Sequence, residues 1–302
     1  MKNYGVIDLG TNTFHLLIAS WKKGEGFREQ VRERRFVKLG EEGLERLGPQ
    51  AYQRGLQTMR EFKQILDSHQ VDQLRAIGTA ALRTADNGLA FIQEVNEQTG
   101  IRVQLIDGDE EARLIHLGVI QAIPFDETPC LIMDIGGGSV ELIVADQQEV
   151  HWAQSFPVGV AVLQRKFHHS DPIRQREVNA LRRFLQQELK QLFPILESYP
   201  IHELVGASGT FEVLEELLPP DGVISLYTSF FSSSFYPFFQ SILATTHQER
   251  LAMEKLPESR ADMFVVAMLL LEFILRKTGA HRITVSKYAM KEGILWEMLS
   301  KE

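Results

Sequence analysis

The chain has 302 residues, of which 44% are hydrophobic and 24% charged, and this balance excludes a disordered, collagen-like or coiled-coil protein. Its length favours two domains and leaves ample chain to bury a core without a metal or disulfide staple. The formal net charge of −8 argues against broad binding to DNA or RNA, although a local cluster or a divalent cation could still meet a polyanionic substrate.

Apolar periodicity predicts strands that alternate with helices, which is typical of the α/β class. In chain order we expect the strands Val6–Leu9 and Phe14–Ser20, an exposed strand pair over Phe27–Leu39, the helix Gln50–Ser68, the strand Leu74–Thr79, the helix Leu89–Thr99 capped by Gly100, the strand Ile101–Ile106, the helix Asp109–Ile123, the strands Cys130–Ile135 and Val140–Ala145, the long helix Arg174–Leu196, the strand Glu203–Ala207, the helices Phe211–Leu218 and Ala261–Lys277, the strand Arg282–Val285 and the helix Met290–Leu299.

The best linker candidate is the segment Pro124–Pro129. It predicts an N-terminal domain over residues 1–123 and a C-terminal domain over residues 124–302, whose final helix at about 290–302 could pack back on the first domain. The single cysteine, Cys130, is expected to be buried and excludes an internal disulfide framework. The start of the chain shows no leader pattern, and no apolar stretch reaches the ~20 residues that span a bilayer. We therefore expect a cytoplasmic protein without a membrane partner.

An internal repeat joins the two predicted domains. Residues 7–20 (IDLGTNTFHLLIAS) align without gaps onto residues 133–146 (MDIGGGSVELIVAD), an offset of 126 residues (134 − 8). Asp8 matches Asp134, and Gly10 matches Gly136. We expect two related domains, each opening with a hairpin whose turn holds Asp-x-Gly.

The two predicted turns suit phosphate. A turn of Gly, Thr, Asn and Ser exposes backbone N–H groups and hydroxyls to an anion, and glycine allows close approach because no Cβ intervenes. The candidate phosphate-binding residues are Gly10, Thr11, Asn12 and Thr13 in the first turn, and Gly136, Gly137, Gly138 and Ser139 in the second. Asp8 and Asp134 would repel phosphate unless Mg²⁺ lies between them and the anion. The simpler alternative is a pair of ordinary hairpins that use glycine for positive φ.

A run of acidic residues begins the predicted helix before the linker. Asp109, Glu110 and Glu111 would pair favourably with the positive end of the helix dipole, which explains many such runs. The functional alternative is that a glutamate here deprotonates water for attack on a phosphoanhydride.

Several other polar or aromatic residues leave two readings open. Arg83, which follows a strand, could meet a phosphate or pair with Asp86. The basic run Arg28–Lys38 is either a solvated strand face or an entry path for a polyanion. Glu141 directly follows the glycine turn and is a stronger candidate than its repeat partner His15. The aromatic residues between Phe230 and Phe239 are expected to pack in a core. The adjacent histidines at residues 168–169 lack partners at the spacing of a zinc site.

The motifs together resemble the Ppx/GppA family of exopolyphosphatases and guanosine pentaphosphate phosphohydrolases, from about Val6 to Gly293. The motifs that carry the resemblance are DLGTNTFHLLIA, VKLGEEGL, GTAALRTADN, IDGDEEARLIHLGV, DIGGGSVELIV, SFPVGVAVL, GASGTFEVLEEL, SRADM and VSKYAMKEG, in that order. DIGGGS alone is shared by the wider sugar kinase/Hsp70/actin superfamily, whereas EEARLIHLGV and its spacing to DIGGGS are more specific.

The resemblance implies two ribonuclease-H-like domains with the active site in a cleft between them. It implies Mg²⁺-assisted hydrolysis, with Mn²⁺ as a substitute, of a terminal phosphoanhydride in inorganic polyphosphate or pppGpp. The family's base maps onto Glu111, with Glu110 in reserve, its metal-linked positions map onto Asp8, Asp134 and Glu141, and its arginine maps onto Arg83.

The sequence departs from the family pattern at a few positions. The usual serines of the first turn are Thr11 and Thr13, which keep the hydroxyls, whereas Val140 replaces a threonine and loses one. Lys291 stands for an arginine and keeps the charge without the bidentate fork. Longer members carry additional C-terminal helical domains, and a chain ending at Glu302 predicts the short form.

We expect an exopolyphosphatase-type phosphohydrolase that acts on inorganic polyphosphate, with pppGpp hydrolysis as the close alternative. An actin-like nucleotide sensor with little turnover, or a kinase of the same superfamily, stays open. Glu110 and Glu111 favour hydrolysis over binding alone. A homodimer is left open as the oligomeric state.

Overall fold

The computed structural model describes residues 2–22, 26–125, 127–218, 222–224 and 226–300. The chain forms two compact units, Met1–Leu114 with Met290–Glu302 and Ile115–Ala289. Residue 126 of the predicted linker lies outside the described residues, as do the last two residues of the predicted final helix. The predicted domain boundary after residue 123 stays a prediction, and so does the expected cleft.

The first unit is built on a five-stranded sheet in the order β3-β2-β1-β4-β5. Its elements are β1 (Lys2–Leu9), β2 (Thr13–Lys22), β3 (Gly26–Phe36), α1 (Pro49–Ser68), β4 (Gln73–Gly78), α2 (Ala80–Thr84), α3 (Gly88–Thr99), β5 (Val103–Leu105), the start of α4 (Gly108–Val119) and α13 (Met290–Ser300). β2 pairs antiparallel with both β1 and β3. On the other side of β1, β4 pairs parallel with β1 and β5 pairs parallel with β4.

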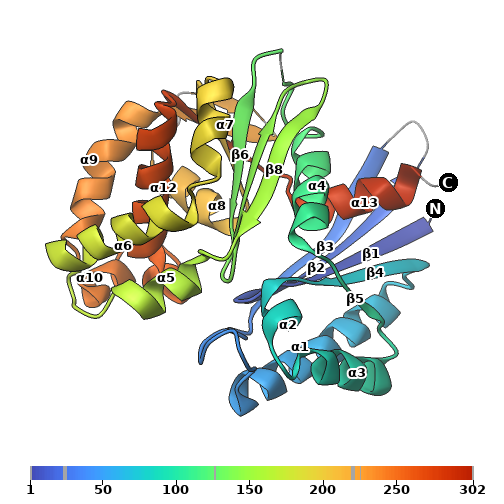
Figure 1. Cartoon of the computed structure of the whole chain (residues 1–302). Helices are drawn as coiled ribbons and strands as arrows, with labels where there is room; N and C mark the ends of the chain where they lie inside the picture. Colours follow the sequence, from blue (N-terminus) through green and yellow to red (C-terminus); the bar gives the residue numbers. More distant parts are fainter. Residues whose placement is uncertain (1, 23–25, 126, 219–221, 225, 301–302) are drawn as a thin grey trace. The chain divides into compact units, whose positions relative to one another are not determined.

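Helices α1 and α3 pack side by side on this sheet (Figure 1). α1 begins at Pro49, where a missing N–H costs nothing, and turns buried residues such as Leu56, Met59 and Phe62 toward the strands. α3 ends at Gly100, whose φ of 73° is the left-handed conformation that glycine adopts without strain, so the predicted cap is confirmed.

The second unit repeats the same sheet and extends it. Its order is β10-β11-β12-β9-β6-β7-β8, so that β8-β7-β6-β9-β12 corresponds to β3-β2-β1-β4-β5. Its elements are β6 (Cys130–Ile135), β7 (Val140–Ala145), β8 (Val150–Phe156), α5 (Val160–Phe167), α6 (Gln175–Glu188), α7 (Leu192–Ser198), β9 (Glu203–Ala207), α8 (Gly209–Leu217), β10 (Gly222–Ile224), β11 (Tyr227–Phe231), α9 (Ser232–Leu243), α10 (His247–Leu251), α11 (Glu258–Ala261), α12 (Phe264–Thr278) and β12 (Arg282–Ser286). The α/β class is confirmed.

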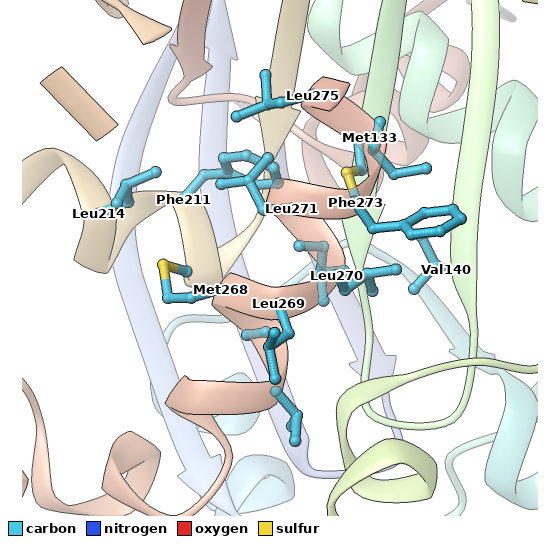
Figure 2. Packing of buried hydrophobic residues seen from close by; sticks show 14 of the residues in the cluster. Met133, Val140, Phe211, Leu214, Met268, Leu269, Leu270, Leu271, Phe273 and Leu275 are labelled. Atoms are coloured by element: carbon cyan, nitrogen blue, oxygen red, sulfur yellow. The ribbon is translucent and has the colours of Figure 1, made fainter. Parts of the chain in front are cut away.

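Helix α12 forms the centre of the second unit's core. Residues Phe264–Leu275 are all buried, which is why every one of them except Glu272 is apolar. Figure 2 shows its side chains beside Met133 and Val140 of the strands and Phe211 and Leu214 of α8. No helix in the described part of the chain is long and apolar enough to cross a membrane.

Three local predictions were wrong or incomplete. Phe27–Leu39 is not a strand pair but a single strand, β3, which pairs with β2 along one edge. The long helix at Arg174–Leu196 breaks into α6 and α7, and the break is invisible to periodicity because Leu185, Leu189 and Leu192 on both sides of it are fully buried. Strand β8, the counterpart of β3, was missed because its residues bury no clean alternating face.

Candidate active site

Two turns with the same geometry follow β1 and β6. The Gly10 N–H donates to the carbonyl of Thr13 at 3.1 Å, and the Gly136 N–H donates to the carbonyl of Ser139 at 3.0 Å. In the flanking ladders Asp8 lies opposite His15, and Asp134 lies opposite Glu141. The backbone therefore reproduces the repeat at the same offset of 126 residues that aligns the two sequences.

The carbonyl groups of the first turn are held by the segment 37–40. The N–H groups of Val37 and Lys38 donate to the Asn12 carbonyl at 3.0 and 2.9 Å, and the Gly40 N–H donates to the Thr11 carbonyl at 3.4 Å. Lys38 adopts a φ of 51°, a left-handed conformation that a residue with a side chain rarely takes.

The carbonyl groups of the second turn are held by the start of helix α5. The N–H groups at residues 159–161 donate to the carbonyls of Gly138, Gly136 and Gly137 at 3.2, 3.0 and 2.9 Å, in that order. Donors that a helix start usually leaves unsatisfied are thus paired with the glycine turn.

The direction of these carbonyls fixes the direction of the amides. In a trans peptide the N–H of the next residue points opposite to the carbonyl. The N–H groups of Asn12 and Thr13 therefore point away from segment 37–40, and those at residues 137–139 point away from α5. Each turn aims a short row of donors to one side, the arrangement that backbone nests use for anions.

Close packing, not a left-handed conformation, explains the first glycine of each turn. Among the described residues the glycines with positive φ are Gly26, Gly43, Gly100 and Gly279, a set outside both turns. A Cβ at Gly10 or Gly136 would instead lie 2.9 Å from the carbonyl oxygen that closes its own turn. At Gly159 a Cβ would lie 2.4 Å from the backbone of Gly137.

The carboxylates of the second unit are oriented by hydroxyl groups. Glu141 is 1% exposed and accepts a hydrogen bond from the Ser155 hydroxyl at 2.7 Å. Asp134, across the ladder from it, accepts one from the Ser208 hydroxyl. Ser208 has a φ of 69° at the start of α8, a costly conformation for serine. Asp8 occupies the equivalent place in the first unit and is half-buried.

Glu111 and Arg83 come together in the first unit. Glu111 is 7% exposed, and its Oε2 lies 3.5 Å from Nη1 of Arg83. The same Nη1 donates to the Ile106 carbonyl at 2.6 Å, which fixes the guanidinium beside the start of α4. The carboxylate that Arg83 meets is thus Glu111, whereas the sequence offered Asp86.

Glu110, the neighbouring candidate, is differently placed. Arg113 donates to both of its carboxylate oxygens, at 2.6 and 2.9 Å, and these hydrogen bonds hold the pKa of Glu110 below its ordinary value. A carboxylate with a lowered pKa is a weaker base. The geometry thus favours Glu111 over Glu110 as a proton acceptor.

The remaining candidates have structural partners. In the basic run, Arg32 pairs with Glu29 and with the buried Glu292, and Arg35 pairs with Glu33, so both arginines have partners within the first unit. Phe230, Phe235, Phe239 and Cys130 are buried, as expected. In the part of the chain that the structure describes, no three His, Cys, Asp or Glu side chains come close enough to hold a metal ion.

Sequence reasoning missed the residues that support these groups. Ser208 lies in the motif GASGTFEVLEEL, and Ser155 and Gly159 lie in SFPVGVAVL, two motifs that carry the resemblance without a role for these residues. Ser155 gave no signal because its strand was not predicted. For Gly159, a glycine just before a helix and an apolar run was the available signal.

Comparison with known proteins gives the family. The family model described as the Ppx/GppA phosphatase family matches residues 17–302. An exopolyphosphatase from Cytophaga hutchinsonii is 36% identical, covers 99% of this chain and 98% of its own, and superposes with a TM-score of 0.94. The Aquifex aeolicus PPX-GPPA enzyme is 25% identical over 98% of this chain and 99% of its own, with a TM-score of 0.79.

Curated relatives are longer than this chain. A guanosine-5'-triphosphate,3'-diphosphate pyrophosphatase from Vibrio vulnificus is 30% identical over 304 aligned residues, which cover 99% of this chain and 59% of the relative. The chain thus spans about three fifths of the curated relatives it matches first. These agreements and the repeated sheets support two ribonuclease-H-like folds. With a family model matching nearly the whole sequence, the chain belongs to the Ppx/GppA phosphatase family.

Proposed function

We propose that this protein is an exopolyphosphatase-type phosphohydrolase that releases the terminal phosphate of inorganic polyphosphate by metal-assisted attack of water. The observation that carries the proposal is the pair of equivalent turns, each of which aims backbone donors to one side. Two such turns suit a ligand with several phosphate groups. The 36% identity to an exopolyphosphatase over almost the full length of both chains supports this substrate class.

In this proposal Glu111 accepts the proton of the attacking water. The water oxygen bonds to the terminal phosphorus, the bridging P–O bond breaks, and the shortened chain leaves with the bridging oxygen. Glu111 is buried, and the guanidinium of Arg83 lies beside it, so its carboxylate is held in place for this task. Arg83 also donates hydrogen bonds from its guanidinium to phosphate oxygens. The N–H groups of the turns, with the hydroxyls of Thr11, Thr13 and Ser139, bind phosphate oxygens.

The residues present fit a hard divalent cation such as Mg²⁺. Asp134 and Glu141 lie opposite each other, and both are oriented by hydroxyl donors, as carboxylate ligands commonly are. Mg²⁺ is usually held by one or two carboxylates together with phosphate oxygens and water, so a site with few protein ligands is the expected kind. Asp8 would help to hold a cation beside the phosphate groups at the first turn. When bound, the cation supplies neutralisation of phosphate charge.

Hydrolysis of the 5'-phosphate of pppGpp is the second candidate. The Vibrio vulnificus relative, named for this nucleotide, is 30% identical over 99% of this chain. Both substrates end in a phosphoanhydride that the same turns would hold.

The experiment is phosphate release from long polyphosphate, pppGpp and ATP side by side, with Mg²⁺ and with Mn²⁺. We expect polyphosphate to be the fastest substrate and chelator to abolish release. Glu111→Gln should lower the rate by about 10²–10⁴-fold, the usual size of a general-base contribution. Glu110→Gln is the matched neighbour and should lose much less. Faster release from pppGpp would select the second candidate, and no release from any substrate would overturn both.

A further inference from the structure

Four charged residues form a closed ion-pair cluster in the first unit, which we call the α4 ion-pair cluster: Arg75 of β4, Glu110 and Arg113 of α4, and Glu297 of α13. Arg113 binds Glu110 through Nε and Nη2 and reaches Oε1 of Glu297 at 2.5 Å. Arg75 donates to the other oxygen of Glu297 and lies 3.6 Å from Glu110. Each charge thus lies between two of opposite sign.

The cluster is partly shielded from water. The side chains of Glu297 and Arg75 are 15% and 20% exposed. Burial alone would raise the pKa of Glu297, but the hydrogen bonds from Arg75 and Arg113 outweigh it and the pKa is lowered. Both carboxylates therefore stay ionised well below neutral pH, and paired groups that are half desolvated are screened less than exposed ones.

The cluster controls how α4 is turned about its own axis. Glu110 and Arg113 are three residues apart and share one face of the helix, whereas Glu111 lies about 100° further round. Asp107 fixes the helix start, since its Oδ1 accepts the Glu110 N–H at 2.9 Å. With one face tied to β4 and α13, the direction of the Glu111 side chain toward Arg83 is set.

Helix α13 is a firm support for the cluster. It packs against β1. Arg32 of β3 binds the fully buried Glu292 at 2.8 Å, and Trp296 meets Phe27 edge-on with ring centroids 6.0 Å apart. Glu297, one residue beyond Trp296, is therefore presented from a helix anchored to two strands of the sheet.

We propose that the α4 ion-pair cluster positions Glu111 for proton transfer, with Glu297 as a positioning residue supplied by the last helix of the chain. The inference rests on the proposed hydrolase function. Orientation of a catalytic group affects the chemical step more than ground-state binding of the substrate. A cluster that served only to hold the fold would change stability and leave the rate per folded molecule as it was.

The test compares Glu297→Gln with Asp67→Asn. Asp67 pairs with Lys63 on the surface of α1 in the same unit, so the control removes the same charge from an ordinary exposed pair. In Glu297→Gln we expect kcat for phosphate release from polyphosphate to fall about tenfold, below the ~10²-fold that a 1 Å misplacement can cost, with KM changed less than about twofold. Asp67→Asn should keep both constants.

A double variant separates positioning from any independent effect. If Glu297 acts through Glu111, then Glu111→Gln/Glu297→Gln should be no slower than Glu111→Gln alone. Arg113→Lys, which keeps the charge without the fork, should retain more kcat than Arg113→Met, and this pair also decides the matter if Glu297→Gln does not fold.

The outcomes are distinguishable. An unchanged kcat in Glu297→Gln, beside a large loss in Glu111→Gln, would overturn the positioning role and leave the hydrolase function standing. Additive losses in the double variant would overturn it as well. A wild-type protein that releases no phosphate from any of the three substrates would overturn the function and this inference together.

Discussion

The two turns are each closed by the same kind of backbone hydrogen bond, but different parts of the chain hold their carbonyl groups. The first, at residues 10–13, lies on an irregular segment that includes the left-handed Lys38. The second, at residues 136–139, is held by the N–H groups of Gly159, which precedes helix α5, and of the first two residues of that helix. A duplicated motif thus keeps its own backbone geometry while the chain around it diverges. We infer that the second turn tolerates less change in its support than the first.

Backbone packing and side-chain packing explain the expected difference. A Cβ at Gly159 would meet the backbone of Gly137 and Gly138 at 2.4–2.5 Å. A Cβ at Gly40, the matching support of the first turn, would meet the methyl group of Thr11 at 2.8 Å and the end of Leu44 at 3.0 Å. Side-chain ends can rotate away, whereas the backbone of a bonded turn cannot.

The largest effect is therefore expected from Gly159→Ala compared with Gly40→Ala. Gly159→Ala should lower the free energy of unfolding by about 1–3 kcal/mol, the usual cost of overpacking. It should also slow phosphate release by about 10²-fold, because the donors at residues 137–139 move. Gly40→Ala should cost less than about 1 kcal/mol and little activity.

Urea unfolding and phosphate release under identical conditions check both variants. Equal losses in the two proteins would show that the supports are equivalent and would remove the contrast drawn between them.

A smaller effect should separate Glu141 from its repeat partner His15. Glu141→Gln keeps the shape and the hydrogen bond from Ser155 but removes the charge that a cation needs. The Mg²⁺ concentration for half-maximal activity should rise about 10–100-fold, as it does when groups around a metal site are altered. His15→Gln should shift it by less than about threefold. A metal titration in which both variants match the wild type would exclude Glu141 from cation binding.

The smallest effect concerns the outer support of the second turn. Glu177 of α6 is 8% exposed, and its carboxylate accepts hydrogen bonds from the loop between α5 and α6. Helix α6 in turn packs against α5. Burial opposes ionisation, but the Ser170 hydroxyl and the N–H groups of Arg174 and His169 outweigh it and lower the pKa of Glu177 from 4.5 to about 2. Because the folded pKa is the lower one, its stabilisation is complete above the unfolded value and is lost as pH falls toward 2.

Glu177→Gln should therefore destabilise the protein by about 1 kcal/mol at pH 7. The difference in unfolding free energy between wild type and variant should shrink steadily between pH 5 and the lowest pH at which the wild type folds. A difference that stays constant over this range would contradict the assigned pKa direction.

The repeat made the turns predictable, while their surroundings were not. Matching Asp-x-Gly motifs predicted both hairpins and the equivalent places of Asp8 and Asp134, because local sequence determines a tight turn. The partners of α4 could not be read in this way. Arg113 and Glu297 are 184 residues apart, and only the folded sheet brings β4, α4 and α13 together.

The choice between the adjacent glutamates shows the same limit. Sequence placed both in the first turn of a helix and gave no reason from spacing to prefer one. Glu110 pairs with Arg113 one turn further along the same helix, whereas Glu111 meets Arg83 of α2. Only the second contact depends on the tertiary fold. Similarly, the strained Ser208 was unpredictable because its conformation is set by the junction of β9 with α8 and by its bond to Asp134.

The central claim, that both turns bind phosphate groups of one ligand, is tested most directly by polyphosphate affinity in two matched variants. Gly10→Val and Gly136→Val each place a Cβ 2.9 Å from the carbonyl oxygen that closes the turn, so the two changes are alike in geometry. Both variants are made in a Glu111→Gln background, which slows turnover, and circular dichroism first shows that each is folded. Both should then weaken binding by a similar factor of about tenfold or more, as expected when two or more hydrogen bonds to phosphate are lost. If Gly10→Val binds polyphosphate as tightly as its parent while Gly136→Val does not, only the second turn holds the ligand and the account is wrong.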